Sequence, residues 1–403
     1  TRYASPTTIK PGDLLIEADA DHNGAFVYGN KESDVSARVE YYSRGEGAPD
    51  SPVWQYIGIP TRAGKTAISM FYEAWMCRWT TAGTMGGLWQ WVTNEEVLQP
   101  FEGYAITQAT QKKYILEGKL NLPVTKTINL DRRDDEGYAF AANSWTAPIK
   151  IQEFIDDDFS NAEKAIYIYH SGKYADWDTN KETIINADLS GATPNPGQYA
   201  VIPIHSAPYM GADSVIPAMQ GFFVKTTTTD AKLKLVYNRV VYDATYFKTS
   251  TQPMRAPRRA AASDGPEVMK LNISGDTYGD RIYLLSQNGF SDGYEDGWDG
   301  RKIDGDINAP RLAVIKEAGE MAVAAVESFD ERNLSFRAGS DSEYTFSFEY
   351  EGETIYLYDR VTGVATEIRT GNTYSFTATN ATPENRFLIT TNPPQIMTDV
   401  NNV

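Results

Sequence analysis

The sequence predicts an all-β protein made of tandem antiparallel β-sandwiches, of the jelly-roll or immunoglobulin-like kind. Composition is the first reason: 25 Tyr, 16 Phe and 8 Trp occur with 31 Gly in 403 residues, a mixture that favours strands and turns. The second reason is that stretches such as residues 164–174 and 344–363 alternate or run together β-branched and aromatic residues. The third is that helical patterning is scarce, with residues 67–79 and 309–319 as the candidates for short helices.

Residues 1–250 form the predicted N-terminal β region, which contains two loosely similar units at about residues 25–130 and 131–248. Each unit has an aromatic strand ending at a proline, a second aromatic strand, and a proline-containing turn into a glycine followed by an aromatic residue. Gly103 and Gly221 are the corresponding glycines, where the backbone can turn tightly while the next ring fills the core. The sequence leaves open whether the two units make one sandwich or two.

Residues 58–66, GIPTRAGKT, end like a phosphate-binding loop. Such a loop has four residues between its first glycine and its Gly-Lys, so that consecutive N–H groups surround a phosphate. Here five residues separate Gly58 from Gly64, and Pro60 between them lacks an N–H group. The corresponding place in the second unit, residues 149–159, has no phosphate-binding character. We therefore predict a strand ended by Pro60, a polar loop after it, and no nucleotide partner.

Residues 249–265 are rich in Pro, Ala, Ser and Arg and lack large aliphatic residues, so they cannot bury enough apolar area to offset the cost of ordering them. We interpret them as an interdomain linker; the alternative is a protease-sensitive basic hinge. Residues 266–393 follow as a C-terminal β-sandwich, and residues 394–403 as a tail.

The chain is acidic, with 37 Lys and Arg against 54 Asp and Glu and a formal net charge of −17. Such a chain is repelled by phosphate backbones and anionic lipids. The sequence contains no apolar run long enough to span a bilayer. It therefore predicts no nucleic-acid partner and no membrane insertion.

Several of these stretches together resemble a known family. The N-terminal region carries PFEGY at residues 100–104, NSWTAPI at 143–149 and PAMQGFFVK at 217–225. The C-terminal module carries NGFSDGYEDGWDGRK at 288–302, and a stretch from YLYDRVTG to RFLIT at 356–390. In this combination they resemble the β-rich region of large secreted and cell-surface proteins of Bacteroidetes.

In that family the region lies just before a C-terminal sorting domain for type IX secretion. The resemblance implies export and display on the surface of a Gram-negative bacterium, and no defined enzyme activity. This chain ends in MTDVNNV without a sorting domain, so we expect it to be a piece of a longer protein.

The densest acidic stretch is SDGYEDGWDGRKIDGDIN at residues 291–308. Glycine-rich acidic loops can supply the six to eight oxygen ligands that calcium prefers. Neither possible register matches an EF-hand, and the alternative is a solvated loop whose carboxylates bond local N–H groups. The candidate calcium ligands are Asp292, Asp296, Asp299, Asp304 and Asp306. A second acidic loop, residues 156–158, is a weaker candidate, and we predict no other cofactor.

The residues that usually carry catalysis are few. Cys77 lies among large apolar neighbours, which indicates a buried inert thiol. The three histidines, His22, His170 and His205, are far apart and make no zinc-ligand spacing. There is no Gly-x-Ser-x-Gly motif either, so the sequence predicts a protein that is not an enzyme.

Tryptophans are the other candidate for ligand contact, because β-sandwich binding modules often offer a flat aromatic platform to sugar rings. Trp89 and Trp91 point to the same side of a predicted strand, which we interpret as a core side. Trp177 and Trp298 lie among polar residues instead, so they are the predicted ligand contacts.

Two functions follow from these observations. The first is a non-enzymatic module of an exported surface protein, for adhesion, display, or binding of glycans or host and surface proteins. The second is an accessory, carbohydrate-binding region of a secreted hydrolase whose catalytic domain lies upstream. A stand-alone glycosidase is a weaker third possibility, which needs two carboxylates close together in a cleft.

Overall fold

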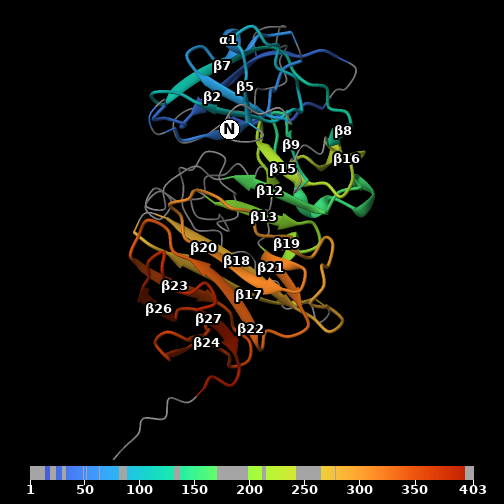
Figure 1. The fold of residues 1–403 in the computed structure, drawn as a ribbon. Helices are drawn as coiled ribbons and strands as arrows, with labels where there is room; N and C mark the ends of the chain where they lie inside the picture. Colours follow the sequence, from blue (N-terminus) through green and yellow to red (C-terminus); the bar gives the residue numbers. More distant parts are fainter. Residues whose placement is uncertain are drawn as a thin grey trace, which may run out of the picture. The chain divides into compact units, whose positions relative to one another are not determined.

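The computed structural model confirms the predicted fold class, because the regular secondary structure of its described residues is almost all β-strand, in mostly antiparallel sheets (Figure 1). It describes residues 14–18, 24–29, 33–48, 50, 52–62, 64–80, 89–130, 137–169, 198–210, 215–241, 265–276 and 278–394. The chain divides into two compact units. One holds most of the chain up to Arg258, and the other holds everything from Arg259 onward.

The first half of the first unit consists of two sheets. One has the order β3-β6-β4-β5, and the other has the order β1-β2-β7 with β1 parallel to β2. Their bounds are β1 (Leu14–Ile16), β2 (Ser36–Ser43), β3 (Gln55–Ile57), β4 (Trp75–Trp79), β5 (Trp89–Trp91), β6 (Tyr104–Thr107) and β7 (Lys112–Lys119).

The second half of the first unit also has a four-stranded sheet, of order β9-β15-β12-β13, and a three-stranded sheet, of order β11-β16-β8. Strands β10 and β14 form a separate pair. The bounds are β8 (Lys126–Leu130), β9 (Tyr138–Ala142), β10 (Ile149–Lys150), β11 (Phe159–Ser160), β12 (Ala165–Tyr169), β13 (Tyr199–Pro203), β14 (Val215–Ile216), β15 (Gly221–Lys225) and β16 (Ala231–Leu235).

The two four-stranded sheets have the same strand order, with the first strand next to the last, then the second and the third. They also exchange reciprocal bridges. Ile57 on β3 bridges Gln220, which precedes β15, and Ala141 on β9 bridges Glu102, the residue before Gly103. Such reciprocity is expected of two similar layers related by an approximate two-fold rotation. The residue boundaries predicted for the two units stay a prediction.

Helices are short and lie between strands: α1 (Ala67–Met70) and the 3₁₀ turns η1 (Ile151–Glu153), η2 (Asp156–Asp158), η3 (Ala207–Tyr209) and η4 (Tyr237–Arg239). The helix predicted over 67–79 forms only in its first four residues, because β4 begins at Trp75. The helix predicted over 309–319 is wrong. Residues 311–316 form a strand paired on both sides, and this tertiary pairing overrides local helix propensity.

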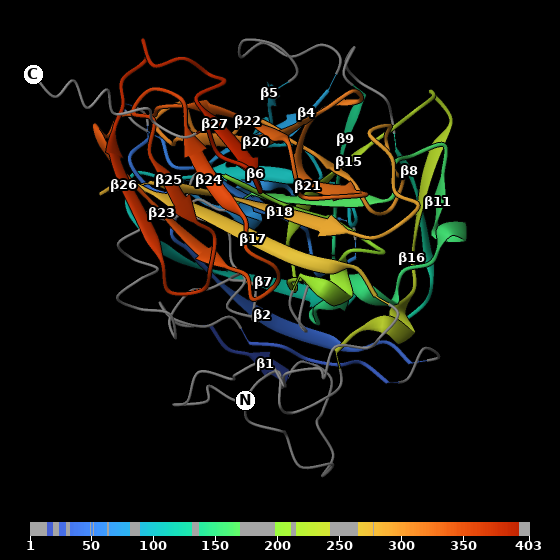
Figure 2. The same ribbon diagram turned by 90° about the horizontal axis from the view of Figure 1, so that it is seen from below.

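The second unit contains one eleven-stranded sheet of order β25-β24-β27-β22-β20-β21-β18-β17-β23-β26, with β19 pairing separately to β21. Its bounds are β17 (Glu267–Ser274), β18 (Gly279–Ser286), β19 (Gly300–Arg301), β20 (Arg311–Lys316), β21 (Gly319–Val326), β22 (Arg332–Arg337), β23 (Glu343–Glu349), β24 (Tyr356–Asp359), β25 (Ala365–Glu367), β26 (Thr373–Thr377) and β27 (Phe387–Thr390). Figure 2 shows the paired strands β17 and β18 side by side.

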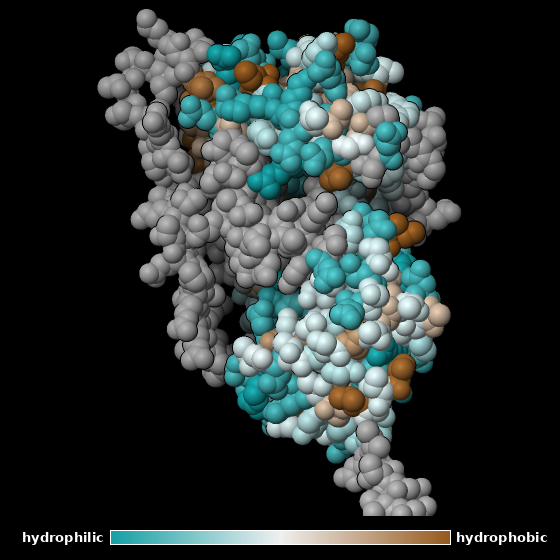
Figure 3. Space-filling model, turned by 90° about the vertical axis from the view of Figure 1, so that its left-hand side faces the viewer, coloured by the Kyte–Doolittle hydropathy of each residue, from teal (hydrophilic) through white to brown (hydrophobic). Residues whose placement is uncertain are grey.

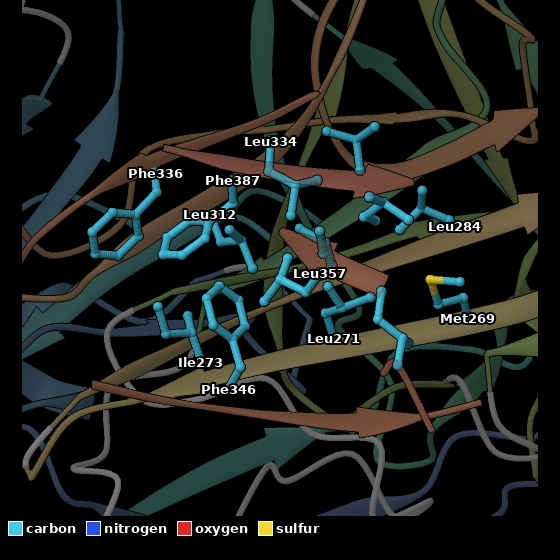
Figure 4. Close-up of a cluster of buried hydrophobic side chains, with 14 of the residues drawn as sticks. Met269, Leu271, Ile273, Leu284, Leu312, Leu334, Phe336, Phe346, Leu357 and Phe387 are labelled. Carbon is cyan, nitrogen blue, oxygen red and sulfur yellow. The ribbon is translucent and has the colours of Figure 1, made fainter. Parts of the chain in front are cut away.

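This sheet folds over on itself. Five strands separate β27 from β23 in the sheet order, yet the rings of Phe387 and Phe346 lie 5.0 Å apart between centroids. Leu271 on β17 and Leu357 on β24 belong to the same buried cluster (Figure 4). The sheet therefore encloses its core as two layers, as a sandwich does.

The predicted linker, residues 249–265, lies outside the described residues except for Gly265, and so does the tail beyond residue 394. These two boundaries stay predictions.

Candidate functional site

The acidic loop of the second unit is anchored by Asp299, whose carboxylate is fully buried. Lys316 Nζ lies 2.7 Å from Asp299 Oδ2, and both side chains have no exposed surface. The backbone N–H groups of Glu295 and Ala325 also donate to this carboxylate, at 2.8 and 2.7 Å. Burial raises the pKa of Asp299, while Lys316 and these N–H groups oppose that rise. Asp299 therefore ties the acidic loop to the strands β20 and β21.

The other predicted calcium ligands already have partners. Asp292 pairs with Arg332 at 2.5 Å, and Asp304 pairs with Arg311 at 2.6 Å. Asp306 accepts a hydrogen bond from the backbone N–H of Asn308 at 2.8 Å. These carboxylates are therefore already bonded to arginine side chains or to a backbone N–H group.

The last of the five, Asp296, is exposed. Within the described ranges, no group of three or more His, Cys, Asp or Glu residues could hold a metal ion. The calcium site, including its weaker alternative at residues 156–158, stays a prediction.

Two further buried ion pairs were not predicted from the sequence. Lys302 Nζ lies 2.5 Å from Asp280 Oδ2, and both side chains are almost completely buried. Burial lowers the pKa of Lys302, and Asp280 opposes that effect. Asp280 also accepts a hydrogen bond from the N–H of Leu312 at 2.6 Å. A charged residue inside an apolar strand pattern, as at Lys316, was the signal that could have revealed such pairs.

The third pair explains the YLYDRVTG and RFLIT motifs of the family resemblance. Arg386 donates two hydrogen bonds to Asp359, at 2.9 and 2.6 Å, and Tyr374 Oη donates a third at 2.7 Å. The Arg386 guanidinium also lies over the ring of Phe376, 4.5 Å from its centroid. The motif residues therefore form one buried cluster that closes the sandwich.

The two tryptophans predicted to contact a ligand have different outcomes. Trp298 is half-buried, and its ring packs against Phe290 with centroids 5.2 Å apart. Trp177 lies outside the described residues. Figure 3 shows residues of intermediate and hydrophilic character on the visible face of the second unit, with scattered hydrophobic ones. Ligand contact at Trp177 and Trp298 stays a prediction.

Aromatic side chains join the two halves of the first unit. The ring of Trp89 lies 5.7 Å from Tyr56 and 5.5 Å from Phe140, between centroids. Phe140 stacks on Phe223 at 4.5 Å. This side of β5 is thus partly a core side, as its alternation predicts.

The same face of the first sheet continues beyond that core as an exposed aromatic patch. Trp91 is 42% exposed and Trp75 is 37% exposed. The half-buried Trp54 contacts Trp91, with ring centroids 6.1 Å apart. Thr107 pairs directly with Trp75 in the sheet and is fully buried, and its hydroxyl has no hydrogen-bond partner among the described residues. The sequence reasoning had not selected these four residues together, because alternation does not reveal where a covering layer ends.

The structure also shows the surroundings of the other residues that the sequence analysis considered for phosphate binding, catalysis or metal binding. The N–H group of Gly58, which a phosphate loop would need, donates to the carbonyl of Met219 at 2.8 Å. Cys77 is buried, which raises the pKa of its thiol to about 12. His205 lies 2.8 Å from Asp156, while His22 and His170 fall outside the described residues.

Among the helices that the structure describes, none has the length and apolarity needed to cross a membrane.

Comparisons with known proteins give two matches. The chain matches the family described as Domain of unknown function (DUF8693) over residues 50–390. It is also similar to the minor fimbrium subunit Mfa5 of Porphyromonas gingivalis, at 25% identity over 411 residues that cover 93% of this chain and 32% of that protein. The chain thus spans about a third of the length of that relative. No solved structure matches the chain.

Proposed function

The chain belongs to the family described as Domain of unknown function (DUF8693), and we propose that it is a non-enzymatic β-sandwich module of a fimbrial or adhesive surface protein. The observation that carries the proposal is the similarity to a fimbrium subunit along 93% of this chain. The bacterium is then Gram-negative and of the Bacteroidetes, and the module is exposed on its surface.

The buried ion pairs support a structural role. Asp299, Asp280 and Asp359 each hold a loop or strand end to a cation inside the second unit. A register slip would leave such a charge buried without a partner, which costs several kcal/mol, about 3–5 for one broken pair. Pairs of this kind favour one strand register, which suits a module that carries ligands or neighbouring subunits. The module needs no cofactor in this role.

The finer parts of the proposal concern export and partners. Export by the type IX route fits the family resemblance, and the partners are glycans or host and surface proteins. The accessory region of a secreted hydrolase is the second candidate. A catalytic domain encoded upstream in the same gene supports that candidate, whereas a further adhesive or fimbrial region supports the first.

Surface labelling tests the proposal. Antibodies raised against the purified chain are applied to intact cells of the source bacterium, with immunogold detection by electron microscopy. Gold on the cell surface or on appendages is the expected result, with loss of the signal after mild proteolysis of intact cells. Labelling only after the cells are permeabilised would refute the proposal. A deletion strain provides the control for antibody specificity.

A further inference from the structure

The exposed aromatic patch of the first unit differs from the equivalent place in the second half. Counting from Gly103 and Gly221, Thr107 on β6 corresponds to Lys225 on β15. In the second half Lys225 pairs with Tyr138, and its ammonium lies over that ring, 4.6 Å from the centroid. Tyr138 is buried there. The second half therefore fills this position with its own side chains.

In the first half, the side chains at the equivalent cross-strand positions do not cover one another in this way. Trp54 corresponds to Tyr138, and Trp75 corresponds to Ala165, which is completely buried. Trp75 instead keeps more than a third of its surface exposed, and the hydroxyl of Thr107 beside it finds no partner in the part of the chain that the structure describes. An unpartnered buried hydroxyl costs about 1–3 kcal/mol, so its presence requires an explanation.

We propose that Trp54, Trp75, Trp91 and Thr107 form a binding site for a neutral saccharide. This inference rests on the proposed function and names the ligand class of the adhesive module. The apolar C–H face of a pyranose stacks on an indole ring, while the hydroxyls at its edge seek hydrogen-bond partners. A site of aromatic surface with few polar groups suits such an amphipathic ligand.

Charge and side-chain motion define the site further. The chain has a net charge of −17, which disfavours sialylated or sulfated glycans. Thr107 is fully buried and pairs in the sheet with the partly exposed Trp75. Exposed side chains change rotamer within nanoseconds, so a rotamer change of the Trp75 ring would let a hydroxyl of a sugar bound on the patch reach Thr107 Oγ1 and give it a partner.

The test uses the whole purified chain. A glycan array carries neutral oligosaccharides of glucose, mannose, galactose and N-acetylglucosamine beside sialylated and sulfated glycans. Titration calorimetry then measures the best neutral probe against the wild type and three variants. Trp91→Ala is expected to weaken binding by about tenfold or more. Thr107→Val, which is nearly isosteric, is expected to weaken binding while the unfolding midpoint stays equal or rises. Trp298→Ala tests the other predicted ligand contact: unchanged binding assigns the ligand to the aromatic patch, and loss of binding assigns it to Trp298.

Four results would overturn the site. They are no binding to any neutral glycan, binding to acidic glycans alone, unchanged affinity in Trp91→Ala, and loss of binding in Trp298→Ala with Trp91→Ala unaffected. Self-association of the wild type that Trp91→Ala abolishes, with no glycan bound, would make the patch a protein interface instead. None of these results decides whether the module is displayed on the cell surface, which the labelling of intact cells measures independently.

Discussion

Tyr56 and Phe140 occupy equivalent positions in the two halves of the first unit, and their rings meet edge to face with centroids 4.9 Å apart. The equivalence follows from the strand pairing. Tyr56 pairs with Ala105, two residues after Gly103, and Phe140 pairs with Phe223, two residues after Gly221. The core between the two halves therefore forms around two equivalent residues, Tyr56 and Phe140. The nearby glycines, Gly103 and Gly221, leave room for their rings.

Gly103→Ala should destabilise the first unit. A Cβ at this position would lie 2.8 Å from three atoms of the Phe140 ring, which is packed on Phe223 and cannot move away freely. Overpacking of this kind costs about 1–3 kcal/mol, which urea-induced unfolding can measure. Gly29→Ala is the control, because no atom of the described residues lies within 4 Å of its added Cβ. Equal stability of the two variants would contradict the packing argument.

Much of this fold could be predicted from local pattern. Alternation identifies the strands, and a proline turn into a glycine-aromatic pair identifies Gly103 and Gly221 as counterparts. The reciprocal bridges of Ile57 and Ala141 could not be predicted, because alternation fixes the face of a strand but not its distant partner. The strand at residues 311–316 was missed for the same reason, since its pairing partners decide its conformation.

The candidate site was less predictable than the fold. Trp298 was chosen for its polar neighbours in sequence, yet it is half-buried against Phe290. Trp91 was assigned to a core side with Trp89, and it remains 42% exposed on the same face. Alternation along a strand shows only to which side of the sheet each side chain points. How far the opposite layer extends depends on tertiary packing.

Cys77 offers a probe of the aromatic patch. Its thiol has a pKa of about 12 because of burial, so it should react very slowly with iodoacetamide at pH 8 in the native chain. Cys77 pairs directly with Trp91 in the sheet, so Trp91→Ala should expose the thiol and speed alkylation by about tenfold or more. Mass spectrometry over time measures the rate, with Trp298→Ala as the control. Rapid native alkylation of the wild type would show that Cys77 is accessible.

Calcium should have little effect on the stability of the second unit. To bind the ion, Asp292 and Asp304 would have to release Arg332 and Arg311. We expect saturating calcium, added after treatment with a chelator, to shift the thermal midpoint by less than about 1 °C. A site filled at 100 times its dissociation constant would add about 2.7 kcal/mol, and so several degrees. A rise of that size, abolished by Asp306→Asn, would instead establish the calcium site.

Acid should weaken the second unit through Asp359. Burial alone would raise the pKa of this carboxyl, but hydrogen bonds from Arg386 and Tyr374 outweigh burial and lower the pKa. A lowered pKa in the folded state gives stability that is present above the unfolded value, about 3.9, and is lost as the pH falls toward the folded value.

Asp359→Asn should therefore be less stable than the wild type at pH 7, by about 3–5 kcal/mol, because Arg386 stays buried without its counter-charge. The difference should shrink below about pH 4, where the wild-type carboxyl takes up its proton. Urea unfolding at pH 7, 5 and 3 measures both effects. Asp292→Asn, at an exposed ion pair with Arg332, is the control and should cost less than about 1 kcal/mol. A difference between Asp359→Asn and wild type that stays constant from pH 7 to 3 would mean that this carboxylate does not contribute to acid unfolding.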